Sequence, residues 1–324
     1  MKKIFKIILF NGLILLGLFF LVELYLNIFD KNHLKHDYEL GWVLKENLNL
    51  KKIEKDFYGN KYSVEFTTQK NGIISYGEEN NTQILIIGDS FSADPYVSIN
   101  KMWHGVLKDK LKKNLNLNVN IKVIGAGGYG TLQQYLLLKR FVSELNPKLI
   151  IFQFCTNDFN NNYLDIEKLT GTINQYSRRP YLSDDKIIYS DGYISKFLRL
   201  KYIGQSRIIN KIVFLLFQKK NKATISDELL ENSKIVTYEI LNKIRQIYPQ
   251  KKYYMFNCNL DDIDQKSFTD VLNFKILNSV KKNLLIAKQT EKEIYYKDGG
   301  HYNELGNKII GDAIFNDLIN ANIF

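Results

Sequence analysis

The sequence predicts an α/β fold, a three-layer sandwich in which helices cover both faces of a central parallel sheet of about five strands. Short apolar runs that end at glycine or at a polar residue alternate with longer stretches of helical periodicity. Such alternation is typical of parallel strands, because each parallel pair needs a long crossover between its members. The chain has 324 residues and 45% of them are hydrophobic, so it can bury a large core.

Five apolar runs give the predicted strands, and five amphipathic stretches give the helices between them. Glycine, asparagine or aspartate stands just after the predicted strands, and these residues favour a turn over continued extension. Strands are predicted over residues 83–87, 119–124, 149–154, 253–256 and 294–296. Helices are predicted over residues 102–115, 131–145, 228–247, 274–290 and 303–319.

The N-terminus predicts a membrane anchor. Lys2, Lys3 and Lys6 precede an apolar stretch that runs to Phe29, long enough to span the roughly 30 Å of a bilayer core. No small-x-small cleavage site appears between residues 19 and 31, which favours an uncleaved signal-anchor over the alternative, a cleaved secretory signal. The lysines stay on the cytoplasmic side, so the single-pass topology predicts that the rest of the chain faces the periplasm or the cell exterior.

Three parts follow from this reading of the chain. Residues 1–30 form the anchor, residues 31–81 form a leading segment of short strands and loops packed on the main domain, and residues 82–324 form that domain. The stretch at about 159–226 is too long for a simple crossover. We interpret it as an insertion over the edge of the site.

Composition excludes several classes of protein. Lys and Arg number 45 against 34 Asp and Glu, but the lysines are scattered without a basic run that alternates with aromatics, so we predict no nucleic-acid partner. Two cysteines exclude a disulfide scaffold and a four-cysteine zinc module. The four histidines have no paired spacing and predict no metal site; they are His33, His36, His104 and His301.

Polar groups suited to acyl transfer stand after the predicted strands, where an open α/β sheet binds its ligands. Ser90 follows the first strand, and a serine hydroxyl needs an adjacent base that a carboxylate orients. Asp298 and His301 supply both on a glycine-containing loop. The N–H of Ser90, a glycine N–H from residues 125–130 and the amide of Asn157 are suitable donors to the oxyanion of the intermediate.

These motifs, in this order, resemble the four blocks of the SGNH (GDSL) hydrolase superfamily, in its membrane-anchored bacterial type, over roughly residues 82–324. The resemblance implies a flavodoxin-like fold with Ser90 as nucleophile and Asp298 and His301 as the rest of the triad. It also implies an oxyanion hole of Ser90, Gly128 and Asn157. The stretch 39–42 (ELGW) resembles the leading segment of membrane-tethered members.

Two departures from the family pattern affect the shape of the pocket. Cys155 stands where the family usually has glycine, and Val123 or Ile124 replaces an asparagine before the second block.

The sequence therefore predicts a membrane-anchored serine ester hydrolase, an acyl or acetyl esterase that works through an acyl-serine intermediate. Its expected substrate is an acylated envelope carbohydrate or a lipid ester, and no metal or organic cofactor is expected. Two alternatives stay open: an O-acyltransferase that uses the same triad, and a tethered glycan-binding or assembly protein without turnover. The sequence leaves the oligomeric state, the acyl length and the alcohol open.

Several residues have a second interpretation. The glycines at 125, 127 and 130 match a dinucleotide-binding fingerprint, although it follows the second strand instead of the first. His104 is the other histidine of the domain, and we expect packing or surface exposure there. We expect free buried thiols at Cys155 and Cys258, since a bridge between adjacent parallel strands fits disulfide geometry poorly.

The aromatic and arginine side chains of the insertion have two interpretations of equal weight. They either line a groove for carbohydrate or acyl groups or form a stabilising cap. The residues concerned are Tyr163, Tyr176, Arg178, Arg179 and Tyr181.

Overall fold

The computed structural model describes residues 2–29, 32–77, 83–170, 178–190, 206–209, 212, 224–296 and 300–324. Its central sheet has six strands, β5 (Ile74–Tyr76), β6 (Ile84–Gly88), β7 (Ile121–Gly125), β8 (Leu149–Phe154), β11 (Lys252–Asn257) and β12 (Lys275–Ile276). Their order is β12-β11-β8-β6-β7-β5. All pairs are parallel except β5 with β7 at one edge. The parallel strands follow the order of a flavodoxin-like sandwich, so the predicted α/β fold is confirmed.

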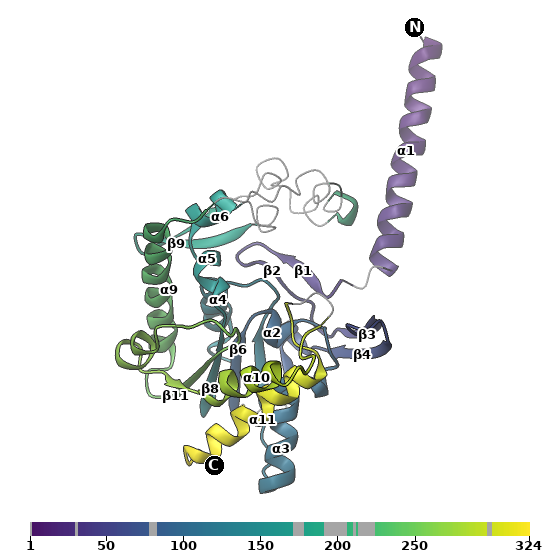
Figure 1. Ribbon diagram of the computed structural model, residues 1–324. Helices are drawn as coiled ribbons and strands as arrows, with labels where there is room; N and C mark the ends of the chain where they lie inside the picture. The colour runs from purple at the N-terminus through teal and green to yellow at the C-terminus, as the bar shows by residue number, and fades with distance from the viewer. Residues whose placement is uncertain are drawn as a thin grey trace.

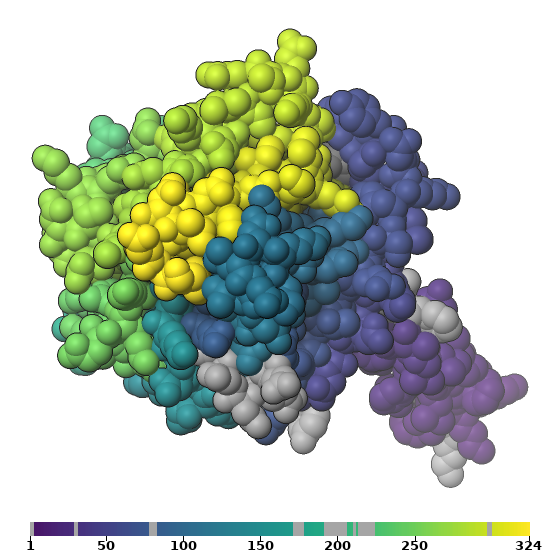
Figure 2. Space-filling model, turned by 90° about the horizontal axis from the view of Figure 1, so that it is seen from below, coloured from purple at the N-terminus to yellow at the C-terminus, as the bar shows by residue number. Residues whose placement is uncertain are grey.

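Helices cover both faces of this sheet (Figure 1). On one face α3 (Trp103–Leu115), α10 (Ser279–Gln289) and α11 (Glu304–Asn320) pack together, and on the other α4 (Thr131–Phe141) packs against α9 (Asp227–Ile247). Figure 2 shows α11, in yellow, beside α3 on the surface seen from below. The shorter helical elements are η1 (Lys70–Gly72), α2 (Ser90–Ala93), η2 (Ile99–Lys101), α5 (Asn157–Asn161), α6 (Leu164–Thr170) and η5 (Ser267–Val271).

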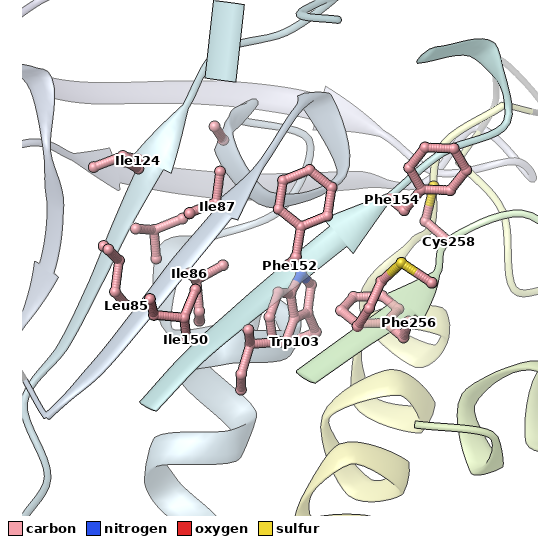
Figure 3. Packing of buried hydrophobic residues seen from close by; sticks show 14 of the residues in the cluster. Leu85, Ile86, Ile87, Trp103, Ile124, Ile150, Phe152, Phe154, Phe256 and Cys258 are labelled. Atoms are coloured by element: carbon pink, nitrogen blue, oxygen red, sulfur yellow. The ribbon is translucent and has the colours of Figure 1, made fainter. Parts of the chain in front are cut away.

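The core lies between the sheet and these two helical layers. Every residue of β6 and β8 is buried, as expected for central parallel strands that are covered on both faces. Trp103, which α3 contributes, packs edge-on against Phe256 of β11 with the ring centres 5.1 Å apart, and both side chains are labelled in Figure 3. Each such side chain stabilises the fold by roughly 1.5–3 kcal/mol through burial. This packing fixes the strand ends that carry the polar groups described below.

The fifth strand is not the one predicted. Residues 294–296 form no strand of the sheet; Tyr295 makes one isolated bridge to Tyr302, and Ile294 and Tyr296 are buried in a loop. The fifth parallel strand is β12, within the stretch predicted as helix 274–290. Asn273 has φ 54°, which interrupts the helical pattern just before β12. A strand of two residues has no periodicity of its own, so its neighbour β11 defines it.

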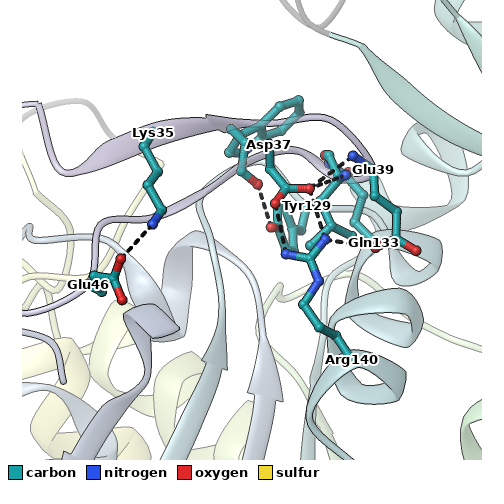
Figure 4. A network of polar contacts seen from close by, with 9 residues as sticks. Lys35, Asp37, Glu39, Glu46, Tyr129, Gln133 and Arg140 are labelled. Atoms are coloured by element: carbon teal, nitrogen blue, oxygen red, sulfur yellow. Dashed lines mark hydrogen bonds and ion pairs between the residues drawn. The ribbon is translucent and has the colours of Figure 1, made fainter. Parts of the chain in front are cut away.

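The segment between the anchor and the main sheet forms two antiparallel ribbons and one sheet strand. β1 (Leu34–Asp37) pairs with β2 (Gly41–Leu44), and β3 (Asn49–Lys55) pairs with β4 (Lys61–Thr67). The turn between β1 and β2 is tied to α4, where Arg140 binds Asp37 and Glu39 at 2.7–2.9 Å (Figure 4). Gln133 of α4 donates to the carbonyl of Leu40 at 2.7 Å.

The described part of the insertion includes a hairpin of β9 (Arg179–Ser183) and β10 (Lys186–Ser190). Arg179 and Tyr181 are each 1% exposed, so they pack against the domain instead of lining an open groove. For these two residues the structure favours the cap. Tyr176 lies outside the described residues.

A single helix, α1 (Lys2–Phe29), precedes these elements and projects away from the central sheet (Figure 1), with Glu23 accepting hydrogen bonds from Ser206 and Arg207 of the insertion at 2.9 and 2.8 Å. Its span Lys3–Ile28 has a mean hydropathy of 2.5 and none of it is buried, which makes it long and apolar enough to cross a membrane. Helices of this kind near an N-terminus are either membrane anchors or signal sequences.

Candidate active site

Ser90 and His301 meet at the carboxyl end of the sheet. The Oγ atom of Ser90 lies 2.9 Å from Nε2 of His301, although 211 positions separate the two residues. Ser90 is the first residue of α2, directly after β6, and His301 lies two residues before α11 begins at Asn303, its N-cap. Both side chains are half-buried. For Ser90 to donate this bond, Nε2 is unprotonated and the ring proton is on Nδ1.

The strand order explains why the loops that carry the predicted oxyanion donors lie beside Ser90. β6 lies between β7 and β8 in the sheet, so the turn that carries Ser90 lies between the loops that follow those two strands. Residues 126–130 form the loop after β7, and residues 155–157 follow β8. This is the point where the strand order reverses, and open α/β sheets bind ligands there.

Aromatic side chains hold the imidazole of His301. The ring of Tyr96 stacks on it at 4.0 Å with an interplanar angle of 16°, and the ring of Phe91 lies 5.1 Å away. The backbone also contributes, because the N–H of Tyr296 donates to the carbonyl of His301 at 2.6 Å. These contacts restrain the imidazole while Nε2 faces the hydroxyl of Ser90.

Hydrogen bonds to two buried side chains fix the turn that precedes Ser90. The carboxylate of Asp89 accepts from the N–H of Phe91 at 3.0 Å and so caps α2. Oε1 of Gln153, a fully buried residue of β8, accepts from the N–H of Asp89 at 3.0 Å and from the hydroxyl of Ser92 at 2.9 Å. A polar side chain that satisfies two donors in a dry core restrains both of them.

Two buried carboxyl groups lie beneath the site. Burial raises the pKa of Asp89 to about 6, although the N–H of Phe91 opposes this effect. Burial and the charge of Asp89 raise the pKa of Asp158 well above its usual range. The carboxyl of Asp158 accepts from the hydroxyl of Thr131 at 3.0 Å. Burial therefore favours the neutral form of this carboxyl, which is adjacent in sequence to Asn157.

The predicted oxyanion donors occupy the flanking loops. Gly128 is half-buried with φ 73°, a left-handed conformation that favours glycine. Within the part of the chain that the structure describes, its N–H donates to no other group. Asn157 begins α5 and is exposed. Asp298, the predicted carboxylate of the triad, lies outside the described residues.

His104 is not placed to act as the base. It is fully buried in α3, where Nε2 lies 3.0 Å from the carbonyl of Ser92 and Nδ1 lies 2.6 Å from the hydroxyl of Tyr76. Burial lowers its pKa to about 4, so it is neutral at pH 7. The expectation of a packing role is consistent with these contacts.

The glycines of the dinucleotide fingerprint are required by close protein packing. A Cβ on Gly125 would lie 2.1 Å from the carbonyl oxygen of Gly88 on the neighbouring strand, and a Cβ on Gly127 would lie 2.2 Å from the carboxylate of Asp94. A carboxylate at that position repels a pyrophosphate. The residues present do not fit a dinucleotide.

Among the described residues, no group of three or more His, Cys, Asp or Glu side chains is arranged to hold a metal ion.

The prediction of free thiols is wrong. Cys155 and Cys258 form a disulfide with a Cα–Cα distance of 5.4 Å. Both residues lie one position beyond the paired strand ends Phe154 and Asn257, and the N–H of Cys258 donates to the carbonyl of Phe154 at 2.8 Å. Adjacent chains are thus still close at this point, and the 5.4 Å between the two Cα atoms lies within the range that a disulfide spans. The bridge joins the loop that carries Asn157 to the loop after β11.

Three residues near the site were not predicted from sequence: Tyr96, Gln153 and Trp42. Gln153 had a usable signal, since it is the polar residue of an otherwise apolar strand. Trp42, in the leading segment, donates from Nε1 to the carbonyl of Gly127 at 2.8 Å. Tyr96 has no such signal, because its stacking on His301 depends on contacts between distant parts of the chain.

A serine hydroxyl bonded to an imidazole at the carboxyl end of a flavodoxin-like sheet defines a serine hydrolase of the α/β class. A family comparison agrees. Residues 84–314 match the model of the GDSL-like lipase/acylhydrolase family, and the chain belongs to this family of ester hydrolases.

Solved structures with a similar chain trace include esterases of low sequence identity. One is the psychrotrophic esterase EstA from Pseudoalteromonas sp., at 12% identity and a TM-score of 0.41, covering 75% of this chain and 100% of that one. Another is a lipase/acylhydrolase from Enterococcus faecalis, at 15% identity and a TM-score of 0.39, covering 74% and 97%. No curated protein sequence matches the chain.

Proposed function

We propose that this ester hydrolase uses Ser90 as its nucleophile and His301 as its general base. The observation that carries the proposal is the 2.9 Å contact between Ser90 Oγ and His301 Nε2. His301 takes the hydroxyl proton as Ser90 attacks the ester carbonyl, and it returns that proton to the leaving alcohol. Water then attacks the acyl-serine in the second half of the cycle, with His301 again as base.

The oxyanion of each tetrahedral intermediate needs preorganised donors. We assign them to the N–H of Ser90, the N–H of Gly128 and the side-chain amide of Asn157, which come from three adjacent loops. Asp298 is assigned to orient His301 on the basis of its motif alone.

The acyl group is proposed to be short. Ser90 and His301 both line a hollow of about 10 Å³, roughly the space of one water molecule. Its other walls include Val97 and Met102, which suit a methyl group better than a charged one. Acetyl is therefore the favoured acyl group.

We further propose that the enzyme is anchored by α1 and faces the periplasm or the cell exterior. The exposed apolar surface of α1 and the lysines at its start support this topology. The disulfide supports it as well, because such bridges persist in oxidising compartments. A tethered enzyme suits a substrate that is itself held in the envelope, such as an acetylated glycan or a lipid ester.

The test compares full-length protein in detergent with Ser90→Ala, His301→Gln and His104→Gln on p-nitrophenyl acetate. Ser90→Ala and His301→Gln should lower kcat by roughly ten-thousandfold. Folded His104→Gln should retain activity, since that imidazole bonds Tyr76 and the carbonyl of Ser92 and not the hydroxyl of Ser90. Equal rates for wild type and Ser90→Ala would refute the proposal and favour a binding protein.

Two further measurements address the finer parts of the proposal. A steep fall in kcat/KM from acetate to octanoate esters would support the short acyl group, and a rise would contradict it. A C-terminal alkaline phosphatase fusion should be active in cells; an inactive phosphatase with a bright fluorescent fusion would reverse the topology. Acylated sugar formed from oligosaccharide acceptors would identify a transferase.

A further inference from the structure

The two peptides that flank the Cα of Gly128 are each held by a side chain from outside the loop. Nε1 of Trp42, in β2, donates to the carbonyl of Gly127 at 2.8 Å. Nη2 of Arg179, in β9, donates to the carbonyl of Gly128 at 2.6 Å. These two carbonyls belong to the peptide planes on either side of the Gly128 Cα, so the two bonds together restrain both of its backbone dihedrals.

The bond from Trp42 acts directly on the proposed oxyanion donor. A trans peptide is planar, and the carbonyl of Gly127 points opposite to the N–H of Gly128 within one plane. Fixing the direction of that carbonyl therefore fixes the direction of the N–H. A hydrogen bond to the carbonyl oxygen also polarises the amide and makes its N–H a stronger donor. Glycine at a positive φ has little conformational restraint of its own, so this external restraint matters.

The two donors are themselves held firmly. Arg179 is 1% exposed, its guanidinium lies 5.1 Å from the ring centre of Trp42, and its Nε is 3.8 Å from the buried carboxylate of Glu167. The ring of Trp42 packs at 5.8 Å from that of Tyr129, whose hydroxyl donates to the carbonyl of Trp42 at 2.5 Å. The backbone is equally close, because a Cβ on Gly41 would lie 1.9 Å from the carbonyl oxygen of Arg178.

We propose that Trp42 and Arg179 are positioning residues that clamp the two peptides on either side of the Gly128 Cα, so that the leading segment and the insertion both set the geometry of the oxyanion hole. This inference rests on the proposed role of Gly128. Neither residue touches the reacting atoms; each acts through a backbone carbonyl. The clamp closes only when β2 and β9 are both docked on the loop after β7.

The decisive variant is Trp42→Phe, which keeps an aromatic ring and removes the N–H. The matched control is Tyr129→Phe, which removes one hydrogen bond from the same contact but leaves the Gly127 carbonyl bonded. Removing an oxyanion donor outright lowers kcat by about 10²–10³-fold, so misorienting one should lower it by about tenfold. We expect Trp42→Phe to lower kcat on p-nitrophenyl acetate by that factor with little change in KM.

A boronic acid inhibitor, which forms a tetrahedral adduct with the serine, should lose affinity for Trp42→Phe in proportion to the loss of kcat/KM. Arg179→Lys, which keeps one charged donor, should retain more activity than Arg179→Met. If Arg179→Met does not fold, the comparison of Trp42→Phe with Tyr129→Phe still decides. Full-length protein in detergent is used throughout, and melting temperatures are measured alongside.

The outcomes separate this inference from the proposed function. Activity that depends on Ser90 but is equal in wild type and Trp42→Phe overturns the clamp alone. Equal losses of kcat in Trp42→Phe and Tyr129→Phe also overturn it, since they indicate a general loosening of the contact. Wild-type activity no higher than that of Ser90→Ala overturns the proposed function and, with it, the clamp.

Discussion

Removing the disulfide between Cys155 and Cys258 should lower the stability of the domain substantially. The bridge closes a loop with a sequence separation of 103 residues. In the chain-entropy description, a cross-link over a loop of that length stabilises the folded state by about 4.7 kcal/mol, and measured values are typically about 2–4 kcal/mol. We therefore expect reduction to lower the melting temperature by roughly 10 °C.

The assay is equilibrium unfolding of the full-length protein in urea, with and without a reducing agent in every sample. The reductant must be present during unfolding, because both cysteines are buried in the folded protein, with at most 1% of their surface exposed. The control is the double variant Cys155→Ala/Cys258→Ala, whose unfolding curve should not respond to reductant. Its stability should lie near that of the reduced wild type, apart from the cost of the two small cavities.

Turnover should change much less than stability. The loop that carries Asn157 has other attachments to the neighbouring loop: the N–H of Thr156 donates to Asn259 at 3.0 Å, and its hydroxyl donates to Asp261 at 2.9 Å. Reduced protein assayed well below its melting temperature should therefore keep most of its activity. The reasoning would be refuted if the isolated protein, unfolded without reductant, took up an alkylating label on both cysteines.

Two further perturbations test the packing beneath the site. Burial lowers the pKa of His104 to about 4 from 6.5, so the unfolded chain binds a proton more readily than the folded protein. The contribution of His104 to the free energy of unfolding is therefore complete above pH 6.5 and is lost as the pH falls toward 4, by about 3 kcal/mol. The urea midpoints at pH 7 and pH 4.5 should differ less in His104→Gln than in wild type. Equal pH dependence of the two proteins would contradict the assigned burial effect. Gly125→Ala should destabilise the fold by more than about 2 kcal/mol, because the new methyl meets the Gly88 carbonyl, whereas Gly59→Ala, with no atom within 4 Å, should show only the cost of its positive φ. Equal melting temperatures of these two glycine variants would show that the strands separate freely at that point.

The sequence predicts those strands and helices of this fold that have long hydrophobic patterns. β6 and β8 are continuous apolar runs bounded by turn residues, and α9 and α11 have sustained helical periodicity, so all of them are found close to their predicted positions. β12 was missed because a two-residue strand derives its conformation from pairing with β11. The pairing of Cys155 with Cys258 was missed for a related reason, since it depends on the separation of two chains that are distant in sequence. The division of the chain into anchor, leading segment and hydrolase domain stays a prediction.

For the site as for the fold, the sequence predicts residues that stand in local motifs and misses those that act through tertiary contacts. The proximity of Ser90 and His301 was predicted from the order of the motifs, but the strand expected before His301 is absent: residues 294–296 form no strand of the sheet, and His301 instead precedes α11. The roles assigned to Gly128, Asn157 and Asp298 stay predictions. Spacing along the chain does not reveal that Tyr96 stacks on the imidazole or that Trp42 reaches Gly127.

The contacts of Trp42 and Arg179 suggest why an enzyme of this kind keeps segments outside its central fold. The sheet and its helices position Ser90 by burying β6, but a glycine loop has no side chains with which to fix its own peptide planes. Hydrogen-bond donors must therefore come from other parts of the chain. β2, which precedes the loop in sequence, and β9, which follows it, supply them. A displacement of β2 relative to the sheet would therefore be transmitted to the peptide of Gly128 through the indole of Trp42.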